Sequence, residues 1–171
     1  MTEIVVVSGN PRPASRTSVL ARAVGTALAP APASSGAGAP AQAPTLIEVG
    51  SLGPGLLTPG DPATAEALER IRSASVLVVA TPTYKGSYTG VLKVLFDQLP
   101  SQALAGKRAV PVVTAGIAPQ AAAAEALLRQ LLTELGAEVL PGLPVTEADL
   151  PESEAIAAAY AQDFHSRVTA G

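Results

Sequence analysis

The chain is poor in the residue types that build covalent, metal and stacked-aromatic sites. Among 171 residues it has no cysteine, no tryptophan and one histidine, and its aromatic residues make up 3%. Without cysteine there is no disulfide framework, no thiolate nucleophile and no cysteine-based metal site. The lone histidine, His165, makes no metal site by itself, and we expect it on the surface of a helix.

The chain also lacks a strong excess of positive or negative charge, and it lacks long apolar runs. The formal net charge is -3 and no basic run occurs, so binding to nucleic acid or to an anionic membrane is not expected. Apolar residues reach 48%, but no run approaches the roughly 18 apolar residues that a membrane span needs. The first three residues lack the basic start of a signal peptide. These absences predict a soluble, cytoplasmic protein. A chain of 171 residues is long enough for one domain with a core but too short for two ordinary ones, so we expect residues 1–171 to form a single domain.

Short apolar runs alternate with helical patterns along the chain. The runs that predict β-strands lie at residues 4–8, 45–49, 76–80, 109–114 and 138–143. The expected helices lie at residues 16–28, 63–73, 89–98, 119–135 and 152–168. Because strands that alternate with helices are typical of a parallel sheet, we expect an α/β, doubly wound fold.

One segment breaks this alternation. Residues 29–44 consist almost entirely of Ala, Pro, Ser and Gly. Such a low-complexity segment buries too little apolar surface to offset the entropy of ordering, so it predicts a mobile loop. A linker between domains is the alternative, but the 28 residues before it are too few to fold alone.

A polar loop follows the first predicted strand, at residues 8–18. Backbone N–H groups at a helix start, four hydroxyls and two guanidinium groups suit a phosphate monoester. The loop has neither the Gly-Lys-Ser/Thr of a P-loop nor the Gly-x-Gly-x-x-Gly of a dinucleotide turn, which favours a mononucleotide. The candidate ligands are Ser8, Arg12, Ser15, Arg16, Thr17 and Ser18. The alternative is an ordinary turn in which Ser15 caps the helix and the arginines are solvated.

A second loop follows the third predicted strand, where open α/β sheets place their ligands. Pro82 fixes one backbone angle, and Gly86 lets the main chain approach a flat ligand without a Cβ in the way. The candidate binding residues are Pro82, Thr83, Tyr84, Lys85 and Gly86. The alternative is a turn whose tyrosines pack at the edge of the core and whose lysines are solvated.

Together the two loops resemble the NAD(P)H-dependent FMN reductase family, most closely the FMN reductases of two-component alkanesulfonate monooxygenase systems. That family's first loop reads Gly-Ser-x-Arg-x-x-Ser-x-Thr/Ser. It is matched by Gly9, Asn10, Arg12, Ser15 and Thr17, with Asn10 in place of the usual Ser. The second loop matches from Pro82 through Lys93 and is more specific, since quinone and azo reductases share the first. Order and spacing agree over roughly residues 3 to 140.

The resemblance implies a flavodoxin-like fold, with a five-stranded sheet in the order 2-1-3-4-5. It implies that FMN lies across the carboxyl ends of strands one, three and four, and that a hydride passes from NADPH or NADH to flavin N5. The cofactor carries this chemistry, so no recognisable catalytic residue is needed. A homodimer or homotetramer, and a flavin-dependent monooxygenase as partner, are also implied.

A third loop, residues 114–120, departs from the family pattern. The resemblance makes Thr114, Ala115, Gly116 and Gln120 flavin contacts, yet Ala115 replaces a family Gly and Gln120 a family His. Gln can hydrogen-bond a flavin carbonyl or a ribityl hydroxyl, but it carries no positive charge. Stabilisation of the reduced flavin is therefore left to backbone N–H groups and a helix N-terminus.

A further departure concerns the later part of the chain. Ala126 stands where some relatives carry an aromatic residue associated with a π-bulge and a tetramer interface, which leaves open whether FMN is a product or a prosthetic group.

Four carboxylates gather around the last predicted helix start, where they suit the helix dipole. They are Glu147, Asp149, Glu152 and Glu154. We expect no acid/base pair among them.

Three alternatives to a reductase of this kind remain. A quinone or azo reductase with tightly bound FMN shares the first loop. A flavodoxin-type electron carrier is expected to cover its flavin with aromatic residues and to have a strongly acidic face, which this composition disfavours. A flavin-free interaction domain is the third, and visible flavin absorbance of the purified protein excludes it.

Overall fold

The computed structural model describes residues 3–30 and 43–169. Residues 31–42 of the predicted mobile loop lie outside the described residues. Within the described part, no helix has both the length and the apolar character to cross a membrane.

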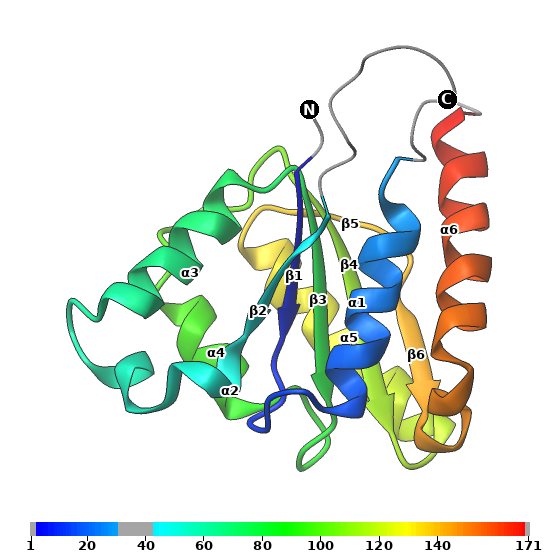
Figure 1. The fold of residues 1–171 in the computed structure, drawn as a ribbon, viewed down its shortest axis with the longest axis horizontal. Coiled ribbons are helices and arrows are strands. Elements are labelled where there is room, and N and C mark those ends of the chain that lie inside the picture. Colours follow the sequence, from blue (N-terminus) through cyan, green and yellow to red (C-terminus); the bar gives the residue numbers. More distant parts are fainter. Residues whose placement is uncertain (1–2, 31–42, 170–171) are drawn as a thin grey trace.

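A parallel sheet forms the centre of the structure (Figure 1). Its strands are β1 (Ile4–Ser8), β2 (Thr45–Glu48), β3 (Val76–Pro82), β4 (Arg108–Ala115), β5 (Glu138–Val139) and β6 (Leu143–Thr146). The order is β2-β1-β3-β4-β5, and β6 also pairs with β4. All of these pairs are parallel, so the predicted fold class and strand order are confirmed.

The fifth predicted strand, residues 138–143, is wrong as a single element. Two short strands stand in its place, β5 and β6, and both pair with β4. Between the two pairings Pro141 has no N–H to donate to the ladder, which interrupts it. The carbonyls of Val139 and Leu140 instead accept hydrogen bonds from Arg129, at 3.4 and 3.0 Å.

Helices cover both faces of the sheet (Figure 1). They are α1 (Arg16–Leu28), α2 (Val49–Leu52), α3 (Pro62–Ser73), α4 (Gly90–Asp97), α5 (Ala118–Glu134) and α6 (Ser153–Thr169), with 3-10 helices η1 (Gly53–Leu57) and η2 (Glu147–Glu152). The five longer helices agree with the predicted ones to within one residue at each end. The short α2, η1 and η2 were not predicted, because elements of four to six residues are too short for periodicity to reveal.

The alternation of side chains along β1 divides the core into two layers. Val5 and Val7 pack with residues of α3, α4 and α5, whereas Ile4 and Val6 pack with residues of α1 and α6. A parallel strand that is buried on both faces in this way reads as a continuous apolar run, which is why β1 and β3 stand out in the sequence. The loops at the carboxyl ends of β1, β3 and β4 lie at one end of the molecule (Figure 1).

Candidate functional site

The loops at the carboxyl ends of β1, β3 and β4 enclose one cavity of about 490 Å³. Its lining comes from α1 and the loop before it, from the end of β3, from Thr114 and from η2. The lining residues are Asn10, Arg12, Pro13, Ala14, Ser15, Arg16, Thr17, Pro82, Tyr84, Thr114, Glu147 and Leu150. Eight of the predicted site residues are thus brought together, from three separate parts of the chain.

The start of α1 forms the polar end of this cavity. Ser15 is the N-cap, and its Oγ accepts a hydrogen bond from the Ser18 N–H at 3.2 Å. The N–H groups of Arg16 and Thr17 belong to the first turn, where a helix has no acceptors of its own. The helix dipole adds partial positive charge there, and Arg12 and Arg16 add two guanidinium groups. This end of the cavity therefore suits an anion.

A carboxylate outside the cavity lining supports this loop through hydrogen bonds. Glu48, at the end of β2, accepts hydrogen bonds from Ser18 Oγ at 2.9 Å and from the Ala14 N–H at 3.2 Å. Because Ser18 Oγ donates its one hydrogen to Glu48, Ser8 Oγ at 2.8 Å donates to Ser18 Oγ. Ser8 and Ser18 are buried and do not line the cavity. The two serines, predicted as phosphate ligands, are placed one layer behind the ligand-facing surface.

Ala14 has a left-handed backbone conformation immediately before the N-cap. Its φ is 54°, which costs an alanine about 1 kcal/mol. Such strain persists only where surrounding contacts fix the backbone, and the hydrogen bond to Glu48 is one of them. The strained residue turns the chain so that Ser15 can cap α1 and the first-turn N–H groups face the cavity.

The second loop is a tight hairpin turn. The N–H and carbonyl of Tyr84 pair with the carbonyl and N–H of Ser87, at 2.9 and 3.2 Å. Between them Lys85 and Gly86 have φ of 51° and 83°, the pattern of a type I′ turn. Pro82 and Tyr84 line the cavity, and Tyr84 is 46% exposed at its rim, whereas Lys85 and Gly86 form the exposed tip.

Hydrogen bonds of threonine residues join the three loops to one another. The N–H and Oγ1 of Thr83 both donate to the Thr114 carbonyl at 2.9 Å, which joins the second loop to the end of β4. Thr89 Oγ1 donates to the Gly9 carbonyl at 2.6 Å, which joins it to the first loop. Thr17 Oγ1 lies 3.3 Å from Thr114 Oγ1 and links α1 to β4. Buried and part-buried hydrogen bonds therefore hold the loops that form the cavity walls together.

The third loop contributes one residue to the lining of the cavity. Thr114 lines the cavity, but Ala115 is buried within the end of β4, and Gly116 and Gln120 are exposed outside the lining. The predicted flavin contacts of these three residues remain predictions.

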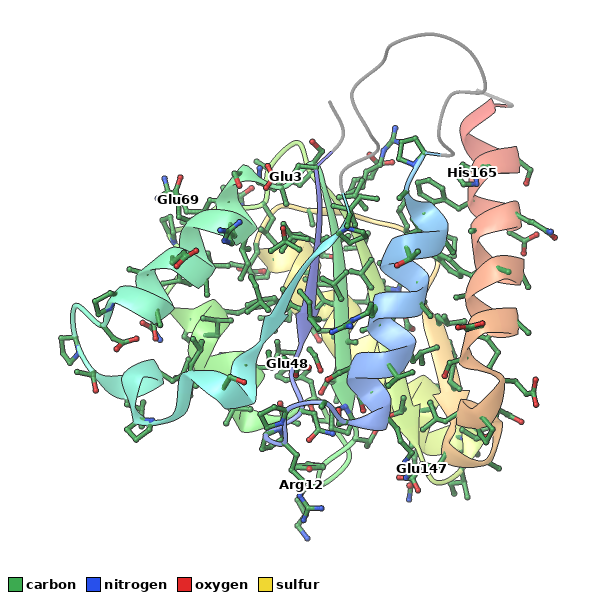
Figure 2. All side chains as sticks on the ribbon, viewed as in Figure 1. Glu3, Arg12, Glu48, Glu69, Glu147 and His165 are labelled. Carbon is green, nitrogen blue, oxygen red and sulfur yellow. The ribbon has the colours of Figure 1, made fainter. Side chains whose placement is uncertain are left out.

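Two residues of η2 line the cavity although they were not predicted to do so. Glu147 Oε2 lies 3.6 Å from Arg16 Nη2, and Leu150 lies beside it in the wall. β6 pairs with β4 so that Thr146 lies opposite Ala115, which brings Glu147 to the same end of the molecule as Arg12 (Figure 2). The sequence signal was its position directly after a parallel strand, since the carboxyl ends of such strands share one edge.

Other charged groups lie away from this cavity. Lys93 donates to Asp97 at 2.6 Å on α4, and this hydrogen bond raises the pKa of Lys93. His165 is exposed on α6 with its ring edge-on to Phe164, as expected for a surface position. Within residues 3–30 and 43–169, no three His, Cys, Asp or Glu side chains lie together as a group that could hold a metal ion.

A comparison with known protein families covers nearly all of the residues that line this cavity. A model of the NADPH-dependent FMN reductase family matches residues 2–149. The chain belongs to this family. The predicted family and reaction class are therefore confirmed: the chain is an NAD(P)H-dependent flavin oxidoreductase with FMN and a nicotinamide as its cofactors.

Individual proteins are also similar to this chain. The NADH-dependent FMN reductase SfnF of Pseudomonas fluorescens (strain Pf0-1) is 35% identical over 156 residues, which are 88% of this chain and 79% of the relative. The FMN reductase (NADPH) of Escherichia coli (strain K12) is 41% identical over 83 residues, so the match spans 48% of this chain and 44% of that enzyme. The solved NADH:FMN oxidoreductase EMOB has a TM-score of 0.74 at 32% identity, over 95% of this chain and 90% of that one.

Proposed function

We propose that the chain binds FMN in the 490 Å³ cavity and reduces it with NADPH or NADH as a single flavodoxin-like domain. The observation that carries the proposal is the meeting of the α1 start, the Pro82–Tyr84 segment and Thr114 in one cavity at the carboxyl edge of the sheet. This edge is where doubly wound folds bind their ligands.

The donors in the cavity fit the parts of FMN. The first-turn N–H groups of α1, the hydroxyls of Ser15 and Thr17, and the guanidinium groups of Arg12 and Arg16 suit the phosphate monoester. At the other end, the turn after Pro82 offers backbone edges, and the half-exposed Tyr84 ring offers an apolar surface to a flat ring system.

When bound, FMN supplies the electron-accepting chemistry, because its N5 takes a hydride from the nicotinamide. The residues of this chain bind the phosphate, orient the ring and hold the loops in register. With Gln120 outside the cavity lining, positive potential near the site comes from the α1 start rather than from a cationic side chain of the third loop.

Steady-state kinetics test this function directly. NADPH and NADH oxidation is followed at 340 nm with FMN, riboflavin or a quinone as acceptor, using protein freed of flavin by dialysis. The proposal expects flavin-dependent turnover and tighter binding of FMN than of riboflavin. Turnover with quinone alone, after FMN has been restored in stoichiometric amount, would instead support a quinone reductase.

We further propose that reduced FMN is handed to a flavin-dependent monooxygenase in the cytoplasm, and that the chain acts as a homodimer or homotetramer. The resemblance to FMN reductases of two-component systems supports the delivery role. Ile117 and Leu127, at and within α5, are large apolar side chains that are exposed, which supports assembly through this helix. Light scattering of the purified protein measures the oligomeric state, and coupled turnover with a purified monooxygenase measures delivery.

A further inference from the structure

The anion-binding end of the cavity contains an acidic side chain. Glu147 and Arg16 both line it, and their Oε2 and Nη2 atoms lie 3.6 Å apart. Among the described residues that line the cavity, the acidic and basic side chains are those of Arg12, Arg16 and Glu147. One negative charge thus stands beside the two positive ones that suit a phosphate.

The Glu147 carboxylate and a phosphate bound at the α1 start have the same partner, the Arg16 guanidinium group. The Arg16 and Glu147 side chains are 67% and 55% exposed, so water screens their pairing and the contact is easily exchanged. Arg16 is also the first residue of α1, next to the N–H groups that attract an anion. A phosphate that enters this end of the cavity meets a guanidinium already engaged by a carboxylate.

We propose that Glu147 competes with the FMN phosphate for Arg16 and so weakens FMN binding. The inference rests on the proposed function. Once the phosphate has taken Arg16, the Glu147 carboxylate stays in the same wall, opposite a group with about two negative charges. Both the lost pairing and this repulsion favour departure of FMN, and neither acts on a flavin without phosphate.

The consequence is a flavin affinity set by two opposing groups. The α1 start and its arginines select FMN over riboflavin, and Glu147 limits how much tighter FMN binds. An enzyme that releases reduced FMN to another protein needs selection without permanent retention. Glu147 supplies the second requirement without loosening the ring-binding part of the cavity.

The test compares FMN and riboflavin affinities of the wild type and Glu147→Gln, measured by flavin fluorescence at fixed ionic strength. The carboxamide keeps the size of the side chain and removes its charge. We expect the FMN dissociation constant to fall by about threefold to tenfold, the range of one exposed charge contact together with screened repulsion, and the riboflavin constant to stay unchanged. Glu152→Gln is the matched control, because this exposed η2 carboxylate does not line the cavity. It is expected to change neither constant.

Two further variants separate competition from long-range charge. Glu147→Asp keeps the charge but shortens the side chain, and is expected to give an FMN constant between those of wild type and Glu147→Gln. In an Arg16→Ala background, Glu147→Gln is expected to give a smaller gain, because the shared partner is gone. An equal gain in both backgrounds overturns competition for Arg16.

The outcomes also separate this inference from the proposed function. If wild type prefers FMN over riboflavin and Glu147→Gln leaves FMN affinity unchanged, only the inference fails. If Glu147→Gln weakens both flavins, Glu147 contacts the flavin itself and the inference is again wrong. If wild type binds FMN no better than riboflavin, the phosphate site and everything that rests on it are rejected.

Discussion

Ser18 Oγ donates a hydrogen bond to Glu48 Oε2 at 2.9 Å, and this contact ties the first turn of α1 to the end of β2. The same carboxylate accepts from the strained Ala14, so two points of the first loop depend on one side chain. The loop that offers N–H groups to an anion is therefore positioned by a residue that does not itself line the cavity.

Glu48→Gln is expected to weaken both the fold and FMN binding. The carboxamide has one oxygen, so either Ser18 Oγ or the Ala14 N–H loses a good acceptor, at a cost of about 0.5–1.5 kcal/mol in unfolding free energy, since neither hydrogen bond is fully buried. Urea denaturation measures this loss, and the FMN constant should rise because the phosphate end of the cavity is less well ordered. The control is Glu66→Gln, which removes only an exposed pair with Arg70 on α3 and should change stability little. Equal effects of the two variants would show that Glu48 does not support the loop.

Arg16→Ala should weaken FMN binding by about tenfold or more, since a charge-assisted contact to phosphate is worth roughly 1.5–3 kcal/mol. Riboflavin affinity should stay the same, because riboflavin has no phosphate. Arg22→Ala is the matched control: this arginine lies on the same helix but lines a different pocket, with Glu48 and Glu154. Titration of both variants with both flavins measures the difference. A similar loss for Arg22→Ala would mean that α1 acts by its overall charge.

The fold was predictable because its signals are local. Residues 4–7 of β1 and 76–80 of β3 are buried on both faces and are all apolar. The helices between the strands have periodic patterns and clear ends. The division between β5 and β6 was not predictable from Pro141 alone. It depends on which residues of β4 lie opposite, which a single strand's sequence does not contain.

The candidate site was predictable as a set of loops but not residue by residue. Ser8 and Ser15 have the same side chain within one loop, yet Ser8 ends β1 facing Ser18 and Ser15 faces the cavity. Residue type identifies a phosphate-binding loop, whereas the direction of each side chain depends on where the strand ends. Glu147 was missed for a related reason, because its place beside Arg16 requires the pairing of β6 with β4.

Gly86→Ala should lower the free energy of unfolding by about 1 kcal/mol, because its φ of 83° is unfavourable for a residue with a Cβ. No atom crowds the added methyl group, so the backbone conformation alone is tested. Gly90→Ala, at the first residue of α4, has equal space and no positive φ, and should leave stability unchanged or slightly raised. Thermal or urea unfolding compares the two. Equal stability of both variants would show that the Lys85–Gly86 turn relaxes without cost.

Ala126→Tyr tests whether this position controls how long FMN stays bound. Ala126 is exposed on α5 next to Leu127, so an aromatic side chain there extends the surface of the helix and leaves the core unchanged. If the aromatic residue of some relatives favours flavin release, the wild type should keep more FMN through dialysis than Ala126→Tyr, as measured by absorbance near 450 nm. Ala158→Tyr, a change at another exposed alanine on α6, controls for added surface area. The comparison is independent of Glu147, which acts on the phosphate end and is intact in all three proteins. Identical flavin retention in the wild type and both variants would show that α5 does not set flavin residence, and that the difference from those relatives lies in the cavity itself.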